Sequence, residues 1–296
     1  MKNRLISGTL YVVILLAFYL LKIFVHDFLF DVLIYGFALI GTFEILRAMQ
    51  DKTTKAQRVL VWIFSIICIP VVAVSEYFFR YGLHVMSVCF FLLVFALLSL
   101  LVVRHEETSP ENIGASLFAA VYPTIMLTLL VLANHIGAES ATAQSLALDS
   151  RLVVLLIFVI SPCADAVAFV FGMLLRKYLP KKMAPTISPN KTVIGGIGGL
   201  VGGMLGALAV YFIYNSLFGS YADMQIWLPV YLATGLVSAA ATEFGDLVES
   251  CIKRKAGIKD MGKVMPGHGG ILDRIDGTLF ATAAVYLVFV IIHLVL

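Results

Sequence analysis

The feature that most constrains this chain is a series of nine apolar runs, each near the roughly 20 residues that a helix needs to cross a bilayer. Hydrophobic residues make up 61% of the sequence and charged residues only 13%, whereas soluble domains average about 25% charged residues. This composition excludes a soluble globular protein. It predicts an all-α, polytopic membrane protein of about nine transmembrane helices, centred near Val13, Ala38, Ile67, Val94, Thr128, Phe158, Gly206, Ala233 and Tyr286.

The basic residues predict how these helices are oriented. When successive loops are assigned to alternate sides of the membrane, 18 of the 21 lysines and arginines fall on one side. Only Lys22, Arg80 and Arg151 fall on the other. Because loops rich in lysine and arginine stay inside, we expect a cytoplasmic N-terminus in a multi-pass protein of the cell inner membrane.

The two halves of the chain differ in charge. Residues 1–150 are expected to hold about five spans, with Glu44 as their main intramembrane charge; we expect Glu44 to pair with Arg47 and reach the membrane surface. Residues 151–296 are expected to hold about four spans and two cytoplasmic loops, 176–193 and 250–276, which carry most of the charge. The second half is therefore the candidate catalytic region.

Glycines recur every four residues in "VIGGIGGLVGGMLG", residues 193–206. On a helix this spacing places them in smooth strips, which predicts close packing against neighbouring helices in lipid. A dinucleotide-binding loop is the alternative, but no GxGxxG register fits and no strand is expected before it. We favour helix packing.

Acidic residues at membrane depth are functional candidates, because a carboxylate there is costly. Asp165 lies inside the sixth span, close to Pro162, which removes a backbone donor from that helix. Glu243, Asp246 and Ser250 are spaced by three and four residues, so they share one helical face that Lys253 continues. This polar stripe leads out of the membrane into the second charged loop.

That loop reads "KDMGKVMPGHGGILDRIDG" over residues 259–277. Its glycines allow backbone N–H groups to approach a phosphate. Asp273 and Asp276 follow at the start of the last span, where an acidic residue such as Asp276 could instead cap the helix. Asp246 before the loop and Asp273 after it could together ligate a hard cation such as Mg²⁺, while the basic side chains between them bind phosphates. Such carboxylates, basic side chains and backbone N–H groups suit phosphoryl transfer between a lipid and a nucleotide at the cytoplasmic surface.

The run formed by Ser250, Lys253, Arg254, Lys259, Asp260, Pro266, "GHGG", Asp273, Arg274 and Asp276 resembles the signature of phosphatidate cytidylyltransferases, also called CDP-diacylglycerol synthases. The segments "FGDLVES" and "ISPNKT" resemble parts of that family too, so the similarity extends over residues 160–296. Asn190, Ile194 and Phe169 stand where the family commonly has Lys, Glu and Tyr. These departures concern substrate preference more than the class of reaction.

The resemblance implies that CTP and phosphatidate react to give CDP-diacylglycerol and pyrophosphate in phospholipid biosynthesis. It implies a membrane-embedded nucleotidyltransferase that needs Mg²⁺, with K⁺ as a candidate second cation, an active site facing the cytoplasm, a homodimer and no nucleic-acid partner. Asp246 and Asp273 correspond to the metal-binding aspartates. The candidate catalytic residues are Asp246, Asp273, Lys259, Asp260, His268 and Arg274. The candidate substrate-binding residues are Asp165, Ser188, Lys191, Ser250, Lys253, Arg254, Gly267, Gly269, Gly270 and Asp276.

Two roles are open for His268: its backbone N–H could contact a phosphate, or its side chain could act as general acid toward the leaving pyrophosphate. Three rival functions also remain. An ion-coupled transporter or channel would use Asp165, Glu243 and Asp246, but it does not account for "PGHGGILDRID". A phosphotransferase acting on an isoprenoid phosphate would differ in its lipid. A membrane scaffold would not require aspartates on both sides of a glycine-rich loop.

Overall fold

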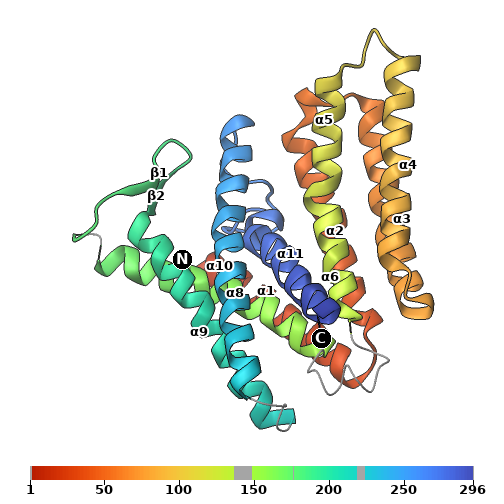
Figure 1. Cartoon of the computed structure of the whole chain (residues 1–296). Coiled ribbons are helices and arrows are strands. Elements are labelled where there is room, and N and C mark those ends of the chain that lie inside the picture. The colour runs from red at the N-terminus through yellow and green to blue at the C-terminus, as the bar shows by residue number, and fades with distance from the viewer. Residues whose placement is uncertain (1, 137–148, 176, 219–223, 296) are drawn as a thin grey trace. The chain divides into compact units, whose positions relative to one another are not determined.

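The computed structural model describes residues 2–136, 149–175, 177–218 and 224–295, and helices make up most of it (Figure 1). The prediction of an all-α protein is therefore confirmed. Arg176, at the start of the expected loop 176–193, lies outside the described residues. The chain forms two compact units, and the boundary between them falls within the last helix, after Arg274.

The first unit contains Met1–His135 and Ala256–Arg274. Its helices are α1 (Lys2–Phe24), α2 (Phe28–Ala48), η1 (Gln50–Lys52), α3 (Lys55–Phe79), α4 (Gly82–Val103), α5 (Pro110–Ala119), η2 (Ala120–Ile125) and α6 (Met126–Asn134). α3 and α4 run side by side (Figure 1), and α2 packs against α1, α3 and α6.

Side chains set where two of these helices begin. Thr54 accepts the N–H of Gln57, whose side chain accepts the N–H of Thr54 in return, so α3 starts with a reciprocal cap. Ser109 and Asn112 make the same arrangement at α5, where Pro110 occupies the first helical position. These caps satisfy backbone donors that would otherwise be unpaired near the membrane surface.

A cluster of hydroxyl groups lies inside the first unit. Thr42 donates to the oxygen of Ser65 at 3.0 Å, and the hydroxyl of Thr124 lies 2.7 Å from that of Ser65 and 3.2 Å from that of Thr42. All three side chains are buried among apolar residues. Hydrogen bonds among themselves let these polar groups remain in an apolar interior.

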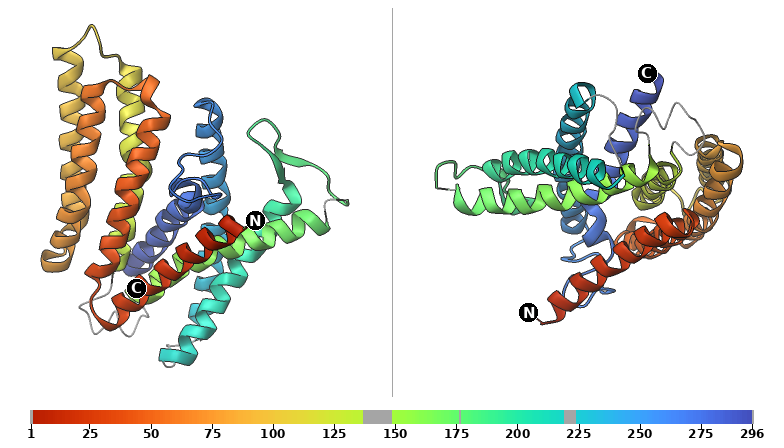
Figure 2. Two further views of the ribbon diagram at one scale, coloured as in Figure 1. Left: turned by 180° about the vertical axis from the view of Figure 1, so that it is seen from behind. Right: turned by 90° about the horizontal axis from the view of Figure 1, so that it is seen from below.

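The second unit contains Ile136–Lys255 and Ile275–Leu296. Its elements are α8 (Ser150–Leu174), β1 (Lys182–Ala184), β2 (Ser188–Thr192), α9 (Val193–Phe218), α10 (Met224–Lys255) and the main part of α11 (Leu272–Val295). α8 and α9 run side by side (Figure 2), α10 packs against both, and β1 pairs antiparallel with β2, with Lys182 opposite Thr192.

The expectation that no strand precedes the glycine-rich segment is wrong, because β2 ends directly before α9. The glycine strips of α9 explain the helix packing, as predicted. A Cβ at Gly202 would lie 2.5 Å from the carbonyl oxygen of Cys163, so one strip faces α8. A Cβ at Gly203 would lie 2.4 Å from the Cβ of Ala239, so the other strip faces α10. Both distances are too short for any side chain, and α9 is therefore held between two helices by direct backbone approach.

Eight stretches of the described residues are helical, long and apolar enough to cross a membrane. They contain eight of the nine expected span centres, and the remaining centre, Ala233, lies in α10, which is 32 residues long. The chain is a multi-pass helical membrane protein. α10 continues through Lys255 and α11 begins at Leu272, so residues 256–271 connect the two helices.

Candidate active site

Three carboxylates gather in the second unit, and we call them the acidic cluster. Asp246 and Glu249 lie one turn apart on α10, and Asp276 belongs to α11. One oxygen of each lies within 4.8 Å of an oxygen of the other two. Glu249 is buried, whereas Asp246 and Asp276 are partly exposed. Like charges this close repel one another, so the cluster needs cations to offset its charge.

A glycine permits the two helices to approach here. A Cβ at Gly245, beside Asp246, would lie 2.7 Å from the carbonyl oxygen of Asp276 and 2.6 Å from the ring of Phe280. Phe244 packs edge-to-face against the same ring, with 5.5 Å between centroids. The short segment 244–246 therefore combines an aromatic contact, a close backbone approach and a carboxylate of the acidic cluster.

The donor set of the acidic cluster fits a hard divalent cation. Carboxylate oxygens are the side-chain ligands that Mg²⁺ prefers. With Mg–O distances of about 2.1 Å, ligands on opposite sides of the ion lie about 4.2 Å apart. The three oxygens of Asp246, Glu249 and Asp276, all within 4.8 Å of one another, match that spacing.

Two lysines contact carboxylates at this site. Nζ of Lys191 lies 2.6 Å from Oδ2 of Asp246 and 2.7 Å from Oε2 of Glu243, and Nζ of Lys253 lies 2.7 Å from Oε2 of Glu249. The polar stripe expected from the spacing along α10 therefore exists as a row of ion pairs. Both lysines were predicted to bind substrate, and their ammonium groups are chemically suited to phosphate oxygens.

The local structure before α9 determines where Lys191 lies. Thr192 accepts the N–H of Gly195 at 3.1 Å and so caps α9, which fixes β2 immediately before the helix. Burial alone would lower the pKa of Lys191, but the carboxylates of Asp246 and Glu243 raise it above its ordinary value. Lys191 is therefore charged at neutral pH.

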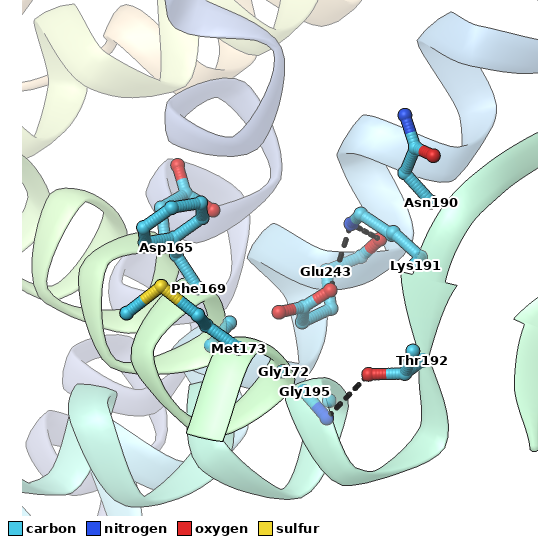
Figure 3. Close-up of a pocket in the computed structure, with 11 residues that line it drawn as sticks. Asp165, Phe169, Gly172, Met173, Asn190, Lys191, Thr192, Gly195 and Glu243 are labelled. Atoms are coloured by element: carbon cyan, nitrogen blue, oxygen red, sulfur yellow. Dashed lines mark hydrogen bonds and ion pairs between the residues drawn. The ribbon is translucent and has the colours of Figure 1, made fainter. Parts of the chain in front are cut away.

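A cavity of about 460 Å³ opens beside Lys191 (Figure 3). Asp165, Phe169 and Met173 line it from α8, and Glu243 lines it from α10. The rest of its wall consists of Ala168, Gly172, Asn190, Lys191, Thr192, Gly195 and Gly196. One part of the wall is charged and another part is apolar, as a site for the headgroup of a lipid requires.

Asp165 shares this cavity with Lys191 and Glu243. It lies in α8 after Pro162, and the helix continues past both residues to Leu174. Its side chain is exposed to the cavity (Figure 3). Its role in binding substrate stays a prediction.

The first unit contains the glycine loop, which we define as residues 259–271. Oδ2 of Asp273, directly after it, accepts the N–H groups of Met261 at 2.8 Å and Gly270 at 2.7 Å. Gly269 has a φ of +88°, and a Cβ there would lie 2.6 Å from Oδ2 of Asp273, so both backbone and space require glycine. Asp273 belongs to the first unit and Asp246 to the second, and their pairing at one metal ion stays a prediction.

One role predicted for His268 is wrong in this structure. Its backbone N–H donates to the carbonyl oxygen of Met265 at 2.9 Å, and the N–H of Met265 donates to Gly269 at 2.9 Å. These bonds close a tight turn, so the N–H of His268 is used within the loop rather than directed at a phosphate. The side chain remains the candidate functional group of His268.

The role predicted for Glu44 is also wrong. Glu44 is only 1% exposed, and its two oxygens accept the N–H groups of Ile271 at 3.1 Å and Leu272 at 2.9 Å. Arg47 donates to the carbonyl oxygen of Met261 at 3.2 Å. The first N–H groups of a helix carry partial positive charge, so a carboxylate is favoured there. Glu44 therefore holds the start of α11 instead of reaching the membrane surface.

The remaining predicted residues occupy the loops and helix ends. Lys259, Asp260 and Arg274 are exposed in the first unit, where Gly267 has a φ of +78°. In the second unit, Ser188 and Ser250 are half-buried, and Arg254 donates to the carbonyl oxygen of Ile187 at 3.4 Å. That last bond joins the end of α10 to the turn of the β1–β2 hairpin.

Sequence reasoning missed Glu249. The signal was present, because Glu249 follows Asp246 by three residues and so lies on the same helical face. The face was instead continued through Ser250, which fits the four-residue spacing equally well. Helical spacing alone does not show which of two adjacent residues, Glu249 or Ser250, contributes to the same cluster as Asp246.

Comparisons with a family model and with individual proteins agree with each other. The model of the Cytidylyltransferase family matches residues 3–292. A phosphatidate cytidylyltransferase of Bacillus subtilis (strain 168) is 29% identical over 292 residues, which cover 97% of this chain and 96% of that protein. A phosphatidate cytidylyltransferase of Staphylococcus haemolyticus (strain JCSC1435) is 38% identical over 132 residues, covering 45% of this chain and 46% of that protein.

A phosphatidate cytidylyltransferase of Staphylococcus aureus (strain COL) is 39% identical over 127 residues, covering 43% of this chain and 45% of that protein. The match to the family model extends over nearly the whole chain, including both units and the expected signature residues. The resemblance inferred from the signature is confirmed. The chain belongs to the Cytidylyltransferase family.

Proposed function

We propose that this protein transfers the cytidylyl group of CTP to phosphatidate, which yields CDP-diacylglycerol and pyrophosphate. The observation that carries the proposal is the acidic cluster with its lysines beside a cavity that is charged on one part and apolar on another. Membership of the Cytidylyltransferase family, and relatives named phosphatidate cytidylyltransferases, support it. No feature of the described residues favours the transporter alternative over this one.

The reaction joins two anions, so the protein must offset charge and align the reactants. A phosphate oxygen of phosphatidate attacks the α-phosphorus of CTP, and the bond from that phosphorus to the bridging oxygen of the β-phosphate breaks. The electron pair stays on the departing pyrophosphate. A phosphate monoester has a second pKa near 6, so phosphatidate reaches the site as a nucleophile without a dedicated general base.

Different residues of the second unit would bind phosphate, hold the metal ion and contact the lipid. Lys191, which lines the cavity with Asp165 and Glu243, would hold a phosphate group there. Asp246, Glu249 and Asp276 would hold Mg²⁺. When bound, that ion would offset charge on the triphosphate and on the leaving group. Phe169 and Met173 would contact the glycerol and acyl part of the lipid.

The first unit contributes the glycine loop to the proposal. Lys259 and Arg274 are exposed there and suited to bind phosphates, and Asp273 is proposed as a further ligand of the metal ion, as the resemblance implies. K⁺ as a second cation, a homodimer, a location in the cell inner membrane and an active site that faces the cytoplasm also belong to this proposal.

The experiment is a direct assay of purified protein in detergent micelles. With CTP, phosphatidate and Mg²⁺ we expect CDP-lipid and pyrophosphate in equal amounts, and no product when EDTA removes the metal. Asp246→Asn should reduce turnover about 10³-fold, because it removes charge at the metal and the partner of Lys191. Glu107→Gln is the matched control, since Glu107 is exposed and remote in sequence from the signature.

Failure of folded parent protein to form CDP-lipid from any phosphatidate would contradict the proposed reaction. Replacing phosphatidate with an isoprenoid phosphate in the same assay tests the rival lipid substrate. Full activity in Asp246→Asn would be consistent with the proposed reaction but would contradict the assignment of the metal site to the acidic cluster.

A further inference from the structure

Lys191 is held by two residues of α10 at once. Its Nζ lies 2.6 Å from Oδ2 of Asp246. It also lies 2.7 Å from Oε2 of Glu243 and 3.4 Å from the carbonyl oxygen of the same residue (Figure 3). A lysine ammonium has three hydrogens to donate, and these three oxygens match that number. Lys191 must therefore give up one of them before it can donate to a phosphate.

The two carboxylates differ in what else they can bind. Asp246 belongs to the acidic cluster, whose oxygens fit Mg²⁺, whereas Glu243 lies one turn earlier on α10. The described residues that line the cavity include Glu243 and Lys191 but not Asp246. A cation at the acidic cluster would repel an ammonium that contacts the same carboxylate. Asp246 is therefore the carboxylate for which a metal ion and Lys191 would compete.

The other partner of Lys191 is fixed in place. Glu243 is only 8% exposed. A Cβ at Gly199 would lie 2.5 Å from its Oε1, so this oxygen rests against the backbone of α9 where glycine leaves room. Oε2, the other oxygen, contacts Lys191. The position of Glu243 on α9 suits it to retain the ammonium without help from Asp246.

We propose that Glu243 is a positioning residue for Lys191, and that Lys191 and the metal ion compete for Asp246. In the absence of metal, the ammonium offsets the charge of Asp246. In its presence, Glu243 keeps Lys191 beside the cavity, and the hydrogen released from Asp246 is directed at a phosphate oxygen of the lipid. This last step rests on the proposed function, whereas the competition rests only on the metal site of the acidic cluster.

The first test measures metal binding and needs no turnover. Mn²⁺ replaces Mg²⁺ as the probe, because the EPR signal of free Mn²⁺ decreases when the ion binds protein in micelles without CTP or lipid. We expect Lys191→Met to bind Mn²⁺ about 10-fold more tightly than the parent, because a competing positive charge is removed. Lys182→Met is the matched control, since Lys182 is exposed in the same hairpin, and its Kd should equal that of the parent.

A double-mutant cycle separates the role of Glu243 from the effect of its charge alone. We expect Glu243→Gln to weaken Mn²⁺ binding about fivefold, because Lys191 then has Asp246 as its remaining carboxylate partner. In the Lys191→Met background the same change should alter the Kd less than about twofold, because no ammonium is left to redistribute. A charge that acts directly on the ion would instead weaken binding in both backgrounds.

Turnover tests the step that uses the phosphate. At saturating CTP and Mg²⁺, Glu243→Gln should raise the KM for phosphatidate about 10-fold and lower kcat less than about threefold, because Lys191 is no longer retained at the cavity. Glu243→Asp keeps the charge and should bring the KM back to within about threefold of the parent. A general loss of structure would lower kcat in both variants alike.

A measurement on the parent covers the case in which Lys191→Met does not fold. The ¹⁵Nζ signal of Lys191 in ¹⁵N-lysine protein, identified by its loss in Lys191→Arg, should shift when Mg²⁺ is added. The signal of Lys182, identified in the same way, should not shift. An unshifted Lys191 signal at saturating Mg²⁺ would overturn the proposal.

Two results of the binding experiment would also overturn it. One is a Kd for Mn²⁺ that is the same in folded Lys191→Met and in the parent, and the other is an equal effect of Glu243→Gln in both backgrounds. A parent that binds no Mn²⁺ overturns the competition together with the metal site. Protein that shows the expected binding pattern but makes no CDP-lipid would instead contradict the proposed function, so the two failures are separable.

Discussion

The two units use buried charge in different ways. In the first unit, the carboxylates of Glu44 and Asp273 accept backbone N–H groups of the glycine loop and of the first turn of α11. In the second unit, Asp246 and Glu249 contact lysine side chains and lie beside a third carboxylate. Glu44 and Asp273 of the first unit hold backbone N–H groups in place, whereas Asp246 and Glu249 of the second unit pair with lysine side chains.

This difference matters for catalysis of phosphoryl transfer. A carboxylate that holds a loop already has its hydrogen bonds satisfied, and it contributes by keeping other groups in place. Clustered carboxylates repel one another, and a bound cation offsets that repulsion. We therefore expect substitutions in the second unit to change the response to Mg²⁺, and substitutions of buried acids in the first unit to change the stability of the loop.

Among the substitutions that compare the two units, the largest effect should come from Glu249→Gln, which removes one charge from the acidic cluster while keeping the size of the side chain. We expect kcat to fall about 10²-fold to 10³-fold and the Mg²⁺ concentration for half-maximal activity to rise about 10-fold, because one of three ligand groups is weakened. The measurement is CDP-lipid formation against Mg²⁺ concentration.

Glu107→Gln, at an exposed ion pair of the first unit, is the control for Glu249→Gln and should leave the Mg²⁺ response unchanged. An unchanged Mg²⁺ response in Glu249→Gln, with kcat reduced, would make Glu249 a partner of Lys253 and not a metal ligand. Glu249 would then have a structural role, like Glu44 and Asp273 in the first unit.

The next largest effect should come from Glu44→Gln in the first unit. The amide keeps one acceptor but faces a backbone donor with its NH₂ group, so we expect a loss of about 2–3 kcal/mol in the free energy of unfolding. The exposed lysines 259 and 263 should then be cut faster by trypsin. Thermal unfolding in detergent and timed proteolysis measure the two effects.

Asp51→Asn is the matched control for Glu44→Gln, because Asp51 is exposed just beyond the end of α2. The Mg²⁺ concentration for half-maximal activity in Glu44→Gln should equal that of the parent. A large shift in that concentration, with stability unchanged, would mean that Glu44 acts on the metal ion, and the division of roles between the units would fail.

Sequence reasoning succeeded where one local rule determines the structure. Runs of apolar residues predicted the helices, because the bilayer requires a fixed length and internally satisfied backbone. The four-residue period of glycines predicted close packing of α9, since that period creates smooth strips on any helix. The stripe on α10 followed from the same arithmetic and appears as ion pairs with Lys191 and Lys253.

It failed where the partner is distant in the chain. Glu44 bonds backbone groups 227 and 228 residues later, and Arg47 is a more obvious partner by spacing. The N–H of His268 was expected to be available, but a glycine-rich turn satisfies its own backbone through residues three or four positions away. The bond from the hydroxyl of Ser7 to the carbonyl oxygen of Pro266 had no local signal at all, because the two residues are 259 positions apart.

The smallest effect concerns packing and compares one glycine from each unit. In the second unit, Gly203→Ala would place a Cβ 2.4 Å from that of Ala239 and 2.7 Å from the carbonyl oxygen of Gly235. α9 and α10 must move apart to accept it, and we expect a loss of about 1–3 kcal/mol in the free energy of unfolding. In the first unit, a Cβ at Gly114 of α5 meets no atom within 4 Å.

Gly114→Ala should therefore raise the free energy of unfolding by up to about 1 kcal/mol, because alanine favours the helix and nothing obstructs its methyl group. Unfolding of both variants in mixed detergent micelles gives the comparison. Equal stability of Gly203→Ala and Gly114→Ala would mean that the glycine strip is not in close contact with α10. Opposite signs would show that the second unit depends on backbone approach at α9, which also places β2 and Lys191 at the cavity.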